Sequence, residues 1–453
     1  MQQKNVNLKS YPPTPLLTAA GINRDFLWNL ARQTGVLQRA SATIDLPLML
    51  ECLCNESVKG CVSYNDLAAQ FEVLTAKTVS RQAFWERINS PSCVDFFEKV
   101  LASVVSRKLN VLKCKFFASA NSFPFKRILI QDSTIIQLPA KLLSVFSGTR
   151  NASSKLCSAR IQNVYDLCAG SFTSFSIDPY SKNDYWAADQ IDAQCGDLVI
   201  RDRGYLIIDN LGDFKRKGID AISRYKHPSK FFDLTGKRID LLQLLSTHGT
   251  LDMIVYGGEN KDVRLRLMAV PVSEEIASQR RKKIKKENHG HAPSGELLEL
   301  MSWSIFLTTI EDPAMTIDFI IQLYELRWRI ENIFKTWKSN FRFEKIHNVS
   351  ENQLRVLLMA RLIVITLAYH EAYVPLHVKI CQNANRQLSL MKLMRYIQRN
   401  LHRLPQMLNP LAWTSALLTA IARYCTYDKR KRKNFIDNQI DIFSKLAALG
   451  ALA

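Results

Sequence analysis

The spacing of apolar and polar residues divides the chain into three successive regions. From about residue 20 to residue 118, apolar residues recur at the helical period, and no segment convincingly resembles a strand. The middle region, which begins near residue 127, is dominated by strand-like runs. From residue 315 to the end the helical period returns. The pattern therefore predicts helical regions on both sides of a sheet-containing core.

Two short helices separated by a turn are expected within the first region, at residues 64–71 and 80–88, each beside a polar residue that can cap it. Such a pair matches the helix-turn-helix arrangement, whose second helix enters the major groove of DNA. It matches a plain helical hairpin equally well. The sequence leaves both interpretations open, because no residue of the pair is forced to read a base.

The middle region should combine strands with helices. Residues 127–139 are rich in β-branched side chains and lie between Pro124 and Pro139, which predicts the first strand. A helix is expected at residues 184–192. Further strands are expected at residues 160–167, 171–177, 197–200, 251–255, 263–270 and 302–308. This mixture is typical of an α/β core.

The charge of the chain indicates a polyanionic partner. Lys and Arg number 61 against 41 Asp and Glu, which gives a formal net charge of +20. Nucleic acid is the first candidate and an anionic membrane is the second. The longest apolar stretch, residues 356–369, is interrupted by Arg361 and is shorter than the roughly 20 residues that a membrane span requires. We therefore expect a buried helix there, and no membrane partner.

Two further features concern the cellular compartment. Residues 1–13 lack the basic start, apolar middle and cleavage site of a signal peptide, so a cytoplasmic protein is expected. The ten cysteines are scattered without the paired spacing of a zinc finger. We expect them to be reduced residues of the core, because free cysteine is among the most buried residue types.

The most informative segment is residues 319–338, which contains no Gly or Pro and is expected to form one uninterrupted helix. At 100° per residue, one arc of roughly 60° collects Tyr324, Arg327, Glu331 and Lys338. The opposite side should pack into the core through Leu323, Leu326, Ile330, Ile333, Phe334 and Trp337. The helix thus presents a carboxylate between two cations and a phenol. Arg327 and Glu331 alone would fit an exposed salt bridge equally well.

Two more acids stand at expected strand positions. Asp132 follows the apolar run at residues 128–130, and Asp202 follows the run at residues 197–201, at the start of a turn. Each alone would fit a capping or turn residue. Together with Glu331 they supply the oxygen ligands that Mg²⁺ prefers. Two such ions, roughly 3.5–4 Å apart, can activate an attacking hydroxyl and stabilise a leaving oxygen.

These residues resemble the signature of the DDE-type insertion-sequence transposases, specifically the insertion-sequence-four family. The signature reads Tyr, two residues, Arg, three residues, Glu, six residues, Lys, and it is matched without a gap by Tyr324, Arg327, Glu331 and Lys338. The similarity also covers DSTIIQLP from Asp132, DRGY from Asp202, and SWSIFLTT at residues 302–309. It runs from about residue 125 to residue 345.

The resemblance implies a DNA transposase with a ribonuclease-H-like catalytic core and an inserted β-rich module. It assigns the catalysis and the binding of Mg²⁺, with Mn²⁺ as a substitute, to Asp132, Asp202 and Glu331. Contacts to DNA phosphates near the cut are assigned to Tyr324, Arg327 and Lys338. A guanidinium and an ammonium beside a metal site would hold a phosphodiester in line and offset charge in the transition state.

Family members with this insertion excise through a hairpin at the transposon end, with a flipped base stacked on Trp. Our candidates are Trp303 and Trp328, because an extruded base needs an aromatic face; for Trp303, ordinary core packing is the alternative. The basic run at residues 280–286 is expected to be a solvated loop that also contacts phosphates. Its first four residues are Arg280, Arg281, Lys282 and Lys283.

Pattern and resemblance together divide the chain into five parts. These are a mobile lead-in at residues 1–20, a helical DNA-binding region at 21–120, the catalytic core at 121–225 and 311–375, the β-rich insertion at 226–310, and a helical C-terminal region at 376–453. The expected partners are double-stranded DNA, as transposon ends and as target. A homodimer is also expected, because two ends must be cut in one assembly, and the C-terminal region is a plausible contact.

Two rival functions remain open on the sequence. A structure-selective nuclease with the same core would cut DNA without joining ends to a target. An inactive DNA-binding regulator would keep the fold, the N-terminal helices and the basic surface, although it would have no need of the three acids or of the signature.

Overall fold

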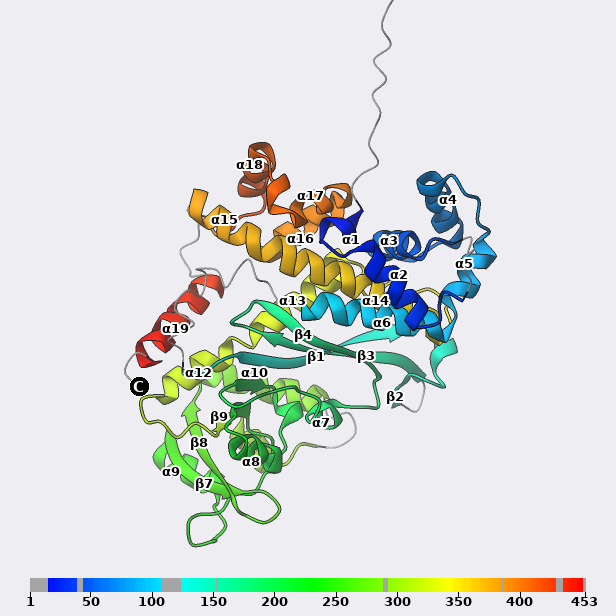
Figure 1. Ribbon diagram of the computed structural model, residues 1–453. Coiled ribbons are helices and arrows are strands. Elements are labelled where there is room, and N and C mark those ends of the chain that lie inside the picture. The colour runs from blue at the N-terminus through cyan, green and yellow to red at the C-terminus, as the bar shows by residue number, and fades with distance from the viewer. Residues whose placement is uncertain are drawn as a thin grey trace, which may run out of the picture. The chain divides into compact units, whose positions relative to one another are not determined.

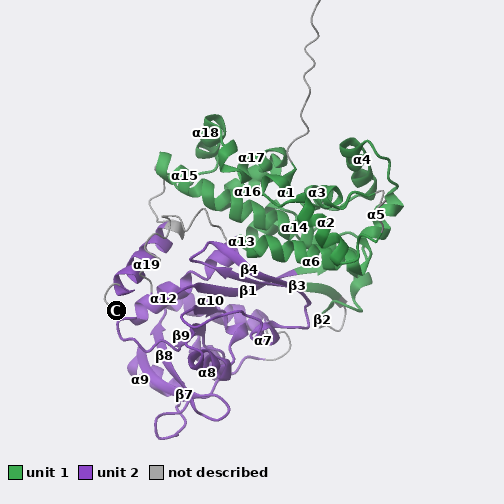
Figure 2. Cartoon of the chain, viewed as in Figure 1, with its two compact units in different colours: residues 1–114, 136–159, 333–430 green, residues 115–135, 160–332, 431–453 purple. Residues whose placement is uncertain are grey.

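The computed structural model describes residues 15–38, 44–107, 124–151, 154–287, 292–384, 386–428 and 435–450 (Figure 1). The chain divides into two compact units, coloured in Figure 2. Unit 1 comprises residues 1–114, 136–159 and 333–430, and unit 2 comprises residues 115–135, 160–332 and 431–453. Most of the expected lead-in lies outside the described residues.

Unit 1 is built mainly from helices, as the periodicity predicted for both flanks. Its N-terminal helices are α1 (Leu16–Ala19), α2 (Arg24–Gln33), α3 (Leu46–Ser57), α4 (Tyr64–Thr75), α5 (Arg81–Ile88) and α6 (Pro91–Ser106). Its C-terminal elements are α14 (Glu351–Leu367), the π-helix η4 (Ala368–Tyr373), α15 (Val374–Ala384), α16 (Leu390–Arg399), η5 (Leu401–Arg403), α17 (Leu404–Leu408), η6 (Pro410–Ala412) and α18 (Ser415–Tyr424).

Helix α14 is the centre of unit 1 and packs against α3 and α6. It starts with a capping box formed by Ser350 and Gln353, and its residues from 356 to 367 are all buried. The expectation of a buried helix at residues 356–369 is therefore confirmed. The helix is longer than the predicted segment, because α14 leads without a break into the π-helix η4 and then into α15. The resulting helix, Glu351–Ala384, is long and apolar enough to cross a membrane. However, 94% of its most apolar 18-residue stretch is buried inside the structure, as in the core helix of a folded unit.

Arg361 is the one charged residue of the apolar stretch, and it is 1% exposed. Its Nε donates to the carbonyl of Ser57 at 2.6 Å, and its Nη1 donates to Phe343 at 3.1 Å. Its Nη2 donates to Gly60 at 2.6 Å and to Lys345 at 2.8 Å. One guanidinium thus ties α14 to the end of α3 and to the segment that follows α13.

The described strands form one nine-stranded sheet in the order β2-β3-β1-β5-β6-β9-β8-β7, with β4 paired to β3. Their bounds are β1 (Ile128–Leu138), β2 (Ser147–Asn151), β3 (Ser154–Asp166), β4 (Ser171–Pro179), β5 (Leu198–Arg201), β6 (Asp220–Arg224), β7 (Leu251–Gly257), β8 (Val263–Pro271) and β9 (Trp303–Thr308). The remaining elements are η2 (Ala140–Leu142), α7 (Asp184–Ala187), η3 (Arg203–Tyr205), α8 (Ile208–Arg216), α9 (Leu241–His248), α10 (Glu274–Glu287), α11 (Gly295–Leu300), α12 (Ile317–Glu325), α13 (Trp328–Asn340) and α19 (Phe435–Gly450).

The expected mixture of strands and helices is confirmed, and all seven expected strands are present. The predicted helix at residues 184–192 is shortened to the single turn of α7. Strand β6 was not predicted, yet it is a central strand that pairs parallel with β5 and antiparallel with β9.

The predicted insertion at residues 226–310 continues the core sheet. Strand β9 joins β6 to β8, and β8 pairs with β7, all in antiparallel register from β6 onward. A single apolar cluster includes residues of β5 and β6 together with residues of β7, β8 and β9. Residues 226–310 accordingly lie in the same compact unit as β5 and β6. The domain boundaries drawn from the sequence stay a prediction.

Candidate active site

The register of β1 and β5 brings two of the three acids together. These strands run parallel, and the last registered pair joins Gln131 to Arg201. Asp132 is the next residue of β1 and Asp202 directly follows β5, so the two acids lie at neighbouring positions where the parallel pairing ends. In open α/β sheets this is the edge at which ligands bind. The buried residues 128–130 and 198–200 anchor both strands in the core.

The third acid lies on a helix that is shorter than expected. The prediction of an uninterrupted helix at residues 319–338 was wrong, because α12 ends at Glu325 and α13 begins at Trp328. At the break, the backbone N–H of Arg327 donates to the carbonyl of Tyr324, three residues back rather than four. The six residues assigned to the core side are nevertheless all buried.

Arg327 brings the site together. Its Nη1 donates to Asp132 Oδ2 at 2.7 Å and its Nη2 donates to Glu331 Oε1 at 2.6 Å. The hydroxyl of Tyr324 donates to Asp202 Oδ1 at 3.3 Å, and the Arg327 guanidinium lies 5.8 Å from the centre of the Tyr324 ring. The structure therefore gathers the three acids, Tyr324 and Arg327 at one place in unit 2.

Burial governs the electrostatics of this cluster. It raises the pKa of Asp132 to about 7, against the opposing effect of Arg327, and the neighbouring Asp202 and Glu331 raise it further. Burial and the charge of Asp202 also raise the pKa of Tyr324, so its hydroxyl keeps its proton and donates. Burial disfavours the charged form of Arg327, but Tyr324 and the three carboxylates hold its pKa above the ordinary value. The site is a concentration of negative charge that requires a cation.

The donor chemistry of the three acids fits a hard divalent ion, which takes oxygen ligands from one or two carboxylates, water and phosphate. In the part of the chain that the structure describes, no three His, Cys, Asp or Glu side chains are gathered closely enough to hold an ion by themselves. The Arg327 guanidinium stands between Asp132 and Glu331 instead. Arg327 thus supplies positive charge to both carboxylates.

A second polar cluster supports both aspartates and was missed from the sequence. Asp184 Oδ1 accepts from the hydroxyl of Ser133 at 2.9 Å, from Arg160 Nη1 at 2.8 Å and from Gln162 Nε2 at 3.2 Å. The hydroxyl of Tyr205 donates to Gln162 Oε1 at 2.5 Å. Ser133 follows Asp132, and Tyr205 ends the DRGY turn, so Asp184 positions the neighbours of both acids.

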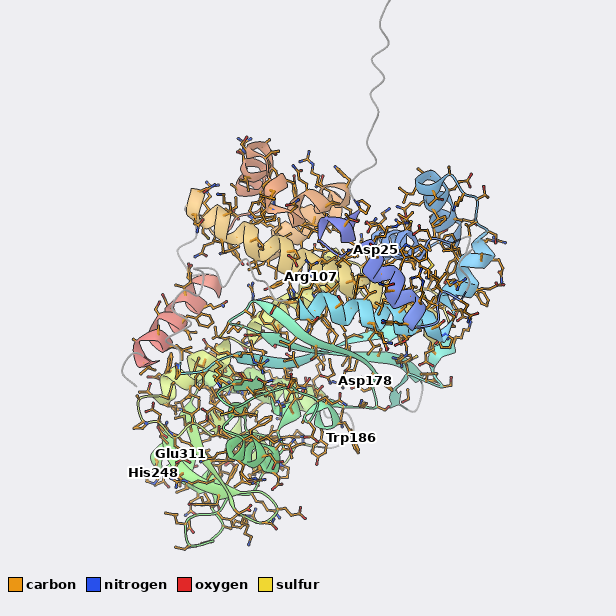
Figure 3. All side chains as sticks on the ribbon, in the orientation of Figure 1. Asp25, Arg107, Asp178, Trp186, His248 and Glu311 are labelled. Carbon is orange, nitrogen blue, oxygen red and sulfur yellow. The ribbon has the colours of Figure 1, made fainter. Side chains whose placement is uncertain are left out.

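Gly204 of the same turn also lies against Asp184. A Cβ atom at position 204 would meet Asp184 Oδ2 at 3.0 Å, which is closer than most such contacts. The only signal in the sequence was the position of Asp184, at the first residue of a short helix capped by Asn183. The same helix carries Tyr185 and Trp186, which are 50% and 66% exposed; Trp186 is labelled in Figure 3.

We expect Asp184→Asn to lower both the DNA cleavage rate and the affinity for Mn²⁺ by about 10-fold, the lower end of the range for residues that orient metal ligands, because Asp184 holds Ser133, the residue next to Asp132. The substitution keeps the shape but leaves the buried Arg160 without its carboxylate. Calorimetric titration with Mn²⁺ and a cleavage assay measure the two effects. The control is Asp189→Asn, an exposed carboxylate bonded to Asn210. Unchanged Mn²⁺ affinity in Asp184→Asn would remove the positioning role.

Lys338 is not described with this cluster, because it belongs to unit 1. There its Nζ pairs with Glu344 at 2.7 Å.

The two candidate tryptophans have different surroundings. The indole N–H of Trp303 donates to the carbonyl of Gly249 at 3.0 Å, and its ring packs on the apolar cluster of the strands. Trp328 is 50% exposed, and Arg327 lies 5.9 Å from the centre of its ring.

The basic run at residues 280–286 was wrongly expected to be a loop, because it is part of helix α10. Arg280 Nη1 donates to the carbonyl of Trp303 at 3.0 Å and its Nη2 donates to Ser304 Oγ at 2.9 Å. Arg281 pairs with Glu274 and donates to Ser302 Oγ at 3.1 Å. Arg280 thus holds α10 on β9, and Arg281 holds it on the residue before β9. Lys282, Lys283, Lys285 and Lys286 are exposed, and Lys283 Nζ lies 3.7 Å from Glu287 Oε1.

The short helix pair predicted near the N-terminus is confirmed as α4 and α5. Ser63 and Ser80 cap them, accepting from the backbone N–H groups of Asp66 at 3.2 Å and of Ala83 at 3.1 Å. The choice between a helix-turn-helix and a helical hairpin stays open.

Comparison with known proteins gives consistent relatives. Residues 123–367 match a family model described as "Transposase DDE domain". The chain is 28% identical over 405 residues to the transposase for insertion sequence element IS231E of Bacillus thuringiensis subsp. finitimus, covering 84% of each protein. It is 25% identical over 438 residues to the IS231F transposase of Bacillus thuringiensis subsp. israelensis, covering 91% of each. The IS1151 transposase of Clostridium perfringens is 28% identical over 330 residues, which is 67% of this chain and 68% of the relative.

Among solved structures, a piggyBac transposase synaptic complex with hairpin DNA aligns with 94% of this chain and 88% of its own, at 9% identity and a TM-score of 0.43. That likeness is too weak to support a conclusion. The family match covers more than half of the chain and contains all three acids of the site. The chain therefore belongs to the DDE transposase family, whose members cleave DNA and transfer strands.

Proposed function

We propose that this transposase cuts and joins DNA at transposon ends by two-metal chemistry, with Asp132, Asp202 and Glu331 as the metal-binding catalytic residues. The observation that carries the proposal is the convergence of the three acids on Arg327 and Tyr324, from two parallel strands and a helix. The expected ion is Mg²⁺, with Mn²⁺ as a substitute. Around the site we propose the ribonuclease-H-like arrangement that the family resemblance implies.

The side chains of the site have distinct tasks in this reaction. A bound divalent metal would activate the attacking hydroxyl and stabilise the leaving oxygen. Arg327 is proposed to turn from the carboxylates to a phosphodiester, which a guanidinium can hold through two hydrogen bonds. Tyr324 keeps its proton and orients Asp202. Lys338, on the same helix as Glu331, is proposed to contact a DNA phosphate near the cut.

We propose cut-and-paste excision through a hairpin at the transposon end. Trp328 is the favoured side chain for stacking on an extruded base, because half of its surface is exposed next to Arg327. Trp303 is less suited, because its indole N–H is bonded and its ring is packed. Lys282 and Lys283 are the residues of α10 proposed to contact DNA backbone phosphates.

The proposed partners are double-stranded DNA, both transposon ends and target, and a second copy of the chain in the synaptic assembly. The proposed location is the cytoplasm, with the nucleoid as the site of action.

The test uses duplexes that carry the inverted repeats flanking the coding segment, incubated with the protein and Mg²⁺. We expect cleavage at the repeat ends, joining of the 3′ ends to a target plasmid, and an end product that runs at double length on a denaturing gel. Cleavage without joining would indicate a structure-selective nuclease instead. Binding without cleavage, with Mg²⁺ or Mn²⁺, would indicate a regulator.

A further inference from the structure

The C-terminal part of unit 1 contains a long stretch without acidic residues. No Asp or Glu occurs in the 56 residues between Glu371 and Asp428, which carry seven Lys or Arg. At the average of the chain, 41 acids in 453 residues, a stretch of this length would carry about five. The side chains of this stretch therefore carry a net charge of +7.

Six of the seven cations are exposed: Lys379, Arg386, Arg395, Arg399, Arg403 and Arg423. They are distributed over α15, α16, η5 and α18 and the link between α15 and α16, which lie together at one end of unit 1 in Figure 2. The seventh, Lys392, is paired with Asp428 at 3.1 Å, at the boundary of the stretch. The charges are thus presented to solvent.

Helix α16 shows how the stretch is oriented. At 100° per residue, Lys392, Arg395 and Arg399 fall within an arc of roughly 60°. The buried residues lie on the opposite side of the helix and are Leu390, Leu393, Met394 and Ile397. The apolar side therefore packs within unit 1, and Arg395 and Arg399 on the cationic side are exposed to solvent.

The chemistry of this surface selects among partners. A membrane would need an exposed apolar side beside the cations, and α16 has buried its own. In the described residues from 372 to 427, the large apolar side chains that are exposed are Leu411 and Tyr424, which is little for a self-association interface. Repeated arginines without acids suit a polyanion with evenly spaced phosphates.

We propose that the six exposed cations of residues 372–427 bind the phosphate backbone of double-stranded DNA without sequence preference. The proposal rests on the proposed function, and it assigns to DNA a region that was considered above as a dimer contact. Backbone contacts of this kind add affinity and position the duplex but do not choose its sequence. The natural role is to hold DNA that must be accepted at any sequence, as target DNA is.

The test compares Arg395→Gln/Arg399→Gln with Lys237→Gln/Arg238→Gln. The control pair removes the same charge from exposed residues of unit 2 that lie between Asp233 and Asp240. Binding to a random-sequence duplex is measured without divalent metal at a series of salt concentrations. We expect the slope of log affinity against log salt to become shallower by about 1 for each arginine removed, and to stay unchanged in the control.

Equal slopes in the two variants would overturn the proposal. So would tight binding of the wild-type protein to phosphatidylserine vesicles that the arginine variant loses, or loss of a dimer on sedimentation with DNA binding intact. Failure of the proposed reaction looks different, because a protein that never cuts or joins DNA could still show the expected slopes.

Discussion

Replacing Glu331 with Gln is expected to abolish DNA cleavage and joining, with a loss of roughly 10³-fold or more, since an outer partner of a metal ligand alone is worth 10- to 100-fold. Gln keeps the shape of the side chain and its place on α13, but it removes the charge that pairs with Arg327 at 2.6 Å. The amide is also a poorer ligand for a hard cation. The measurement is the single-turnover cleavage rate on end-containing DNA.

The matched control is Glu325→Gln, at an exposed position of α12 six residues earlier. It should cut at the wild-type rate. DNA affinity should be similar in both variants, so that the loss in Glu331→Gln is a loss of chemistry. Cleavage by Glu331→Gln at a rate near that of the wild type would contradict the assignment of Glu331.

Replacing Arg361 with Met is expected to destabilise unit 1 by at least about 3 kcal/mol. Met fills much of the space but cannot donate to the carbonyls of Ser57, Gly60, Phe343 and Lys345, which would remain buried without this partner. Differential scanning calorimetry should show the transition of unit 1 lowered by roughly 6–12 °C. The transition temperature of Arg361→Lys should be lowered nearly as much, because a single ammonium group lacks the planar set of donors of a guanidinium.

Arg355→Met is the control for that experiment. Arg355 lies on the same helix, but its side chain is 25% exposed; it pairs with Glu351 at 2.9 Å and its guanidinium lies 5.5 Å from the centre of the Phe146 ring. A partly exposed ion pair contributes about 1 kcal/mol and a cation–π contact about 0.5–1 kcal/mol, so a smaller shift than that of Arg361→Met is expected. Similar shifts in Arg355→Met and Arg361→Met would show that the four carbonyl bonds are not what stabilises α14.

The sequence predicted the parts of the site that depend on local pattern. Asp132 and Asp202 each follow a short apolar run, and the two runs pair in parallel, so the residues after them become neighbours, although β1 itself continues to Leu138. The signature spacing selected Tyr324, Arg327 and Glu331, which the structure brings together. The family was also identified from these motifs. Their catalytic roles stay a prediction until the variants are measured.

The features that the sequence did not predict depend on distant contacts. Nothing in residues 319–338 breaks a helix, and the bond from Arg327 to Asp132 crosses 195 positions of the chain. Strand β6 has five residues, too few for a clear alternation, and is defined by pairing with β5 and β9. Arg280 resembled a solvated cation until its bonds to Trp303 and Ser304 were visible.

The continuity of the sheet through β9 limits how this protein can be shortened. Deleting residues 226–310 would remove β7, β8 and β9, and the β6 strand that now pairs on both sides would become an edge. A strand that is normally central exposes unpaired backbone N–H and C=O groups when it becomes an edge, and these groups can pair with strands of other chains. A truncated copy that kept all three acids would therefore be expected to aggregate, so natural loss of this segment should be accompanied by loss of the soluble protein.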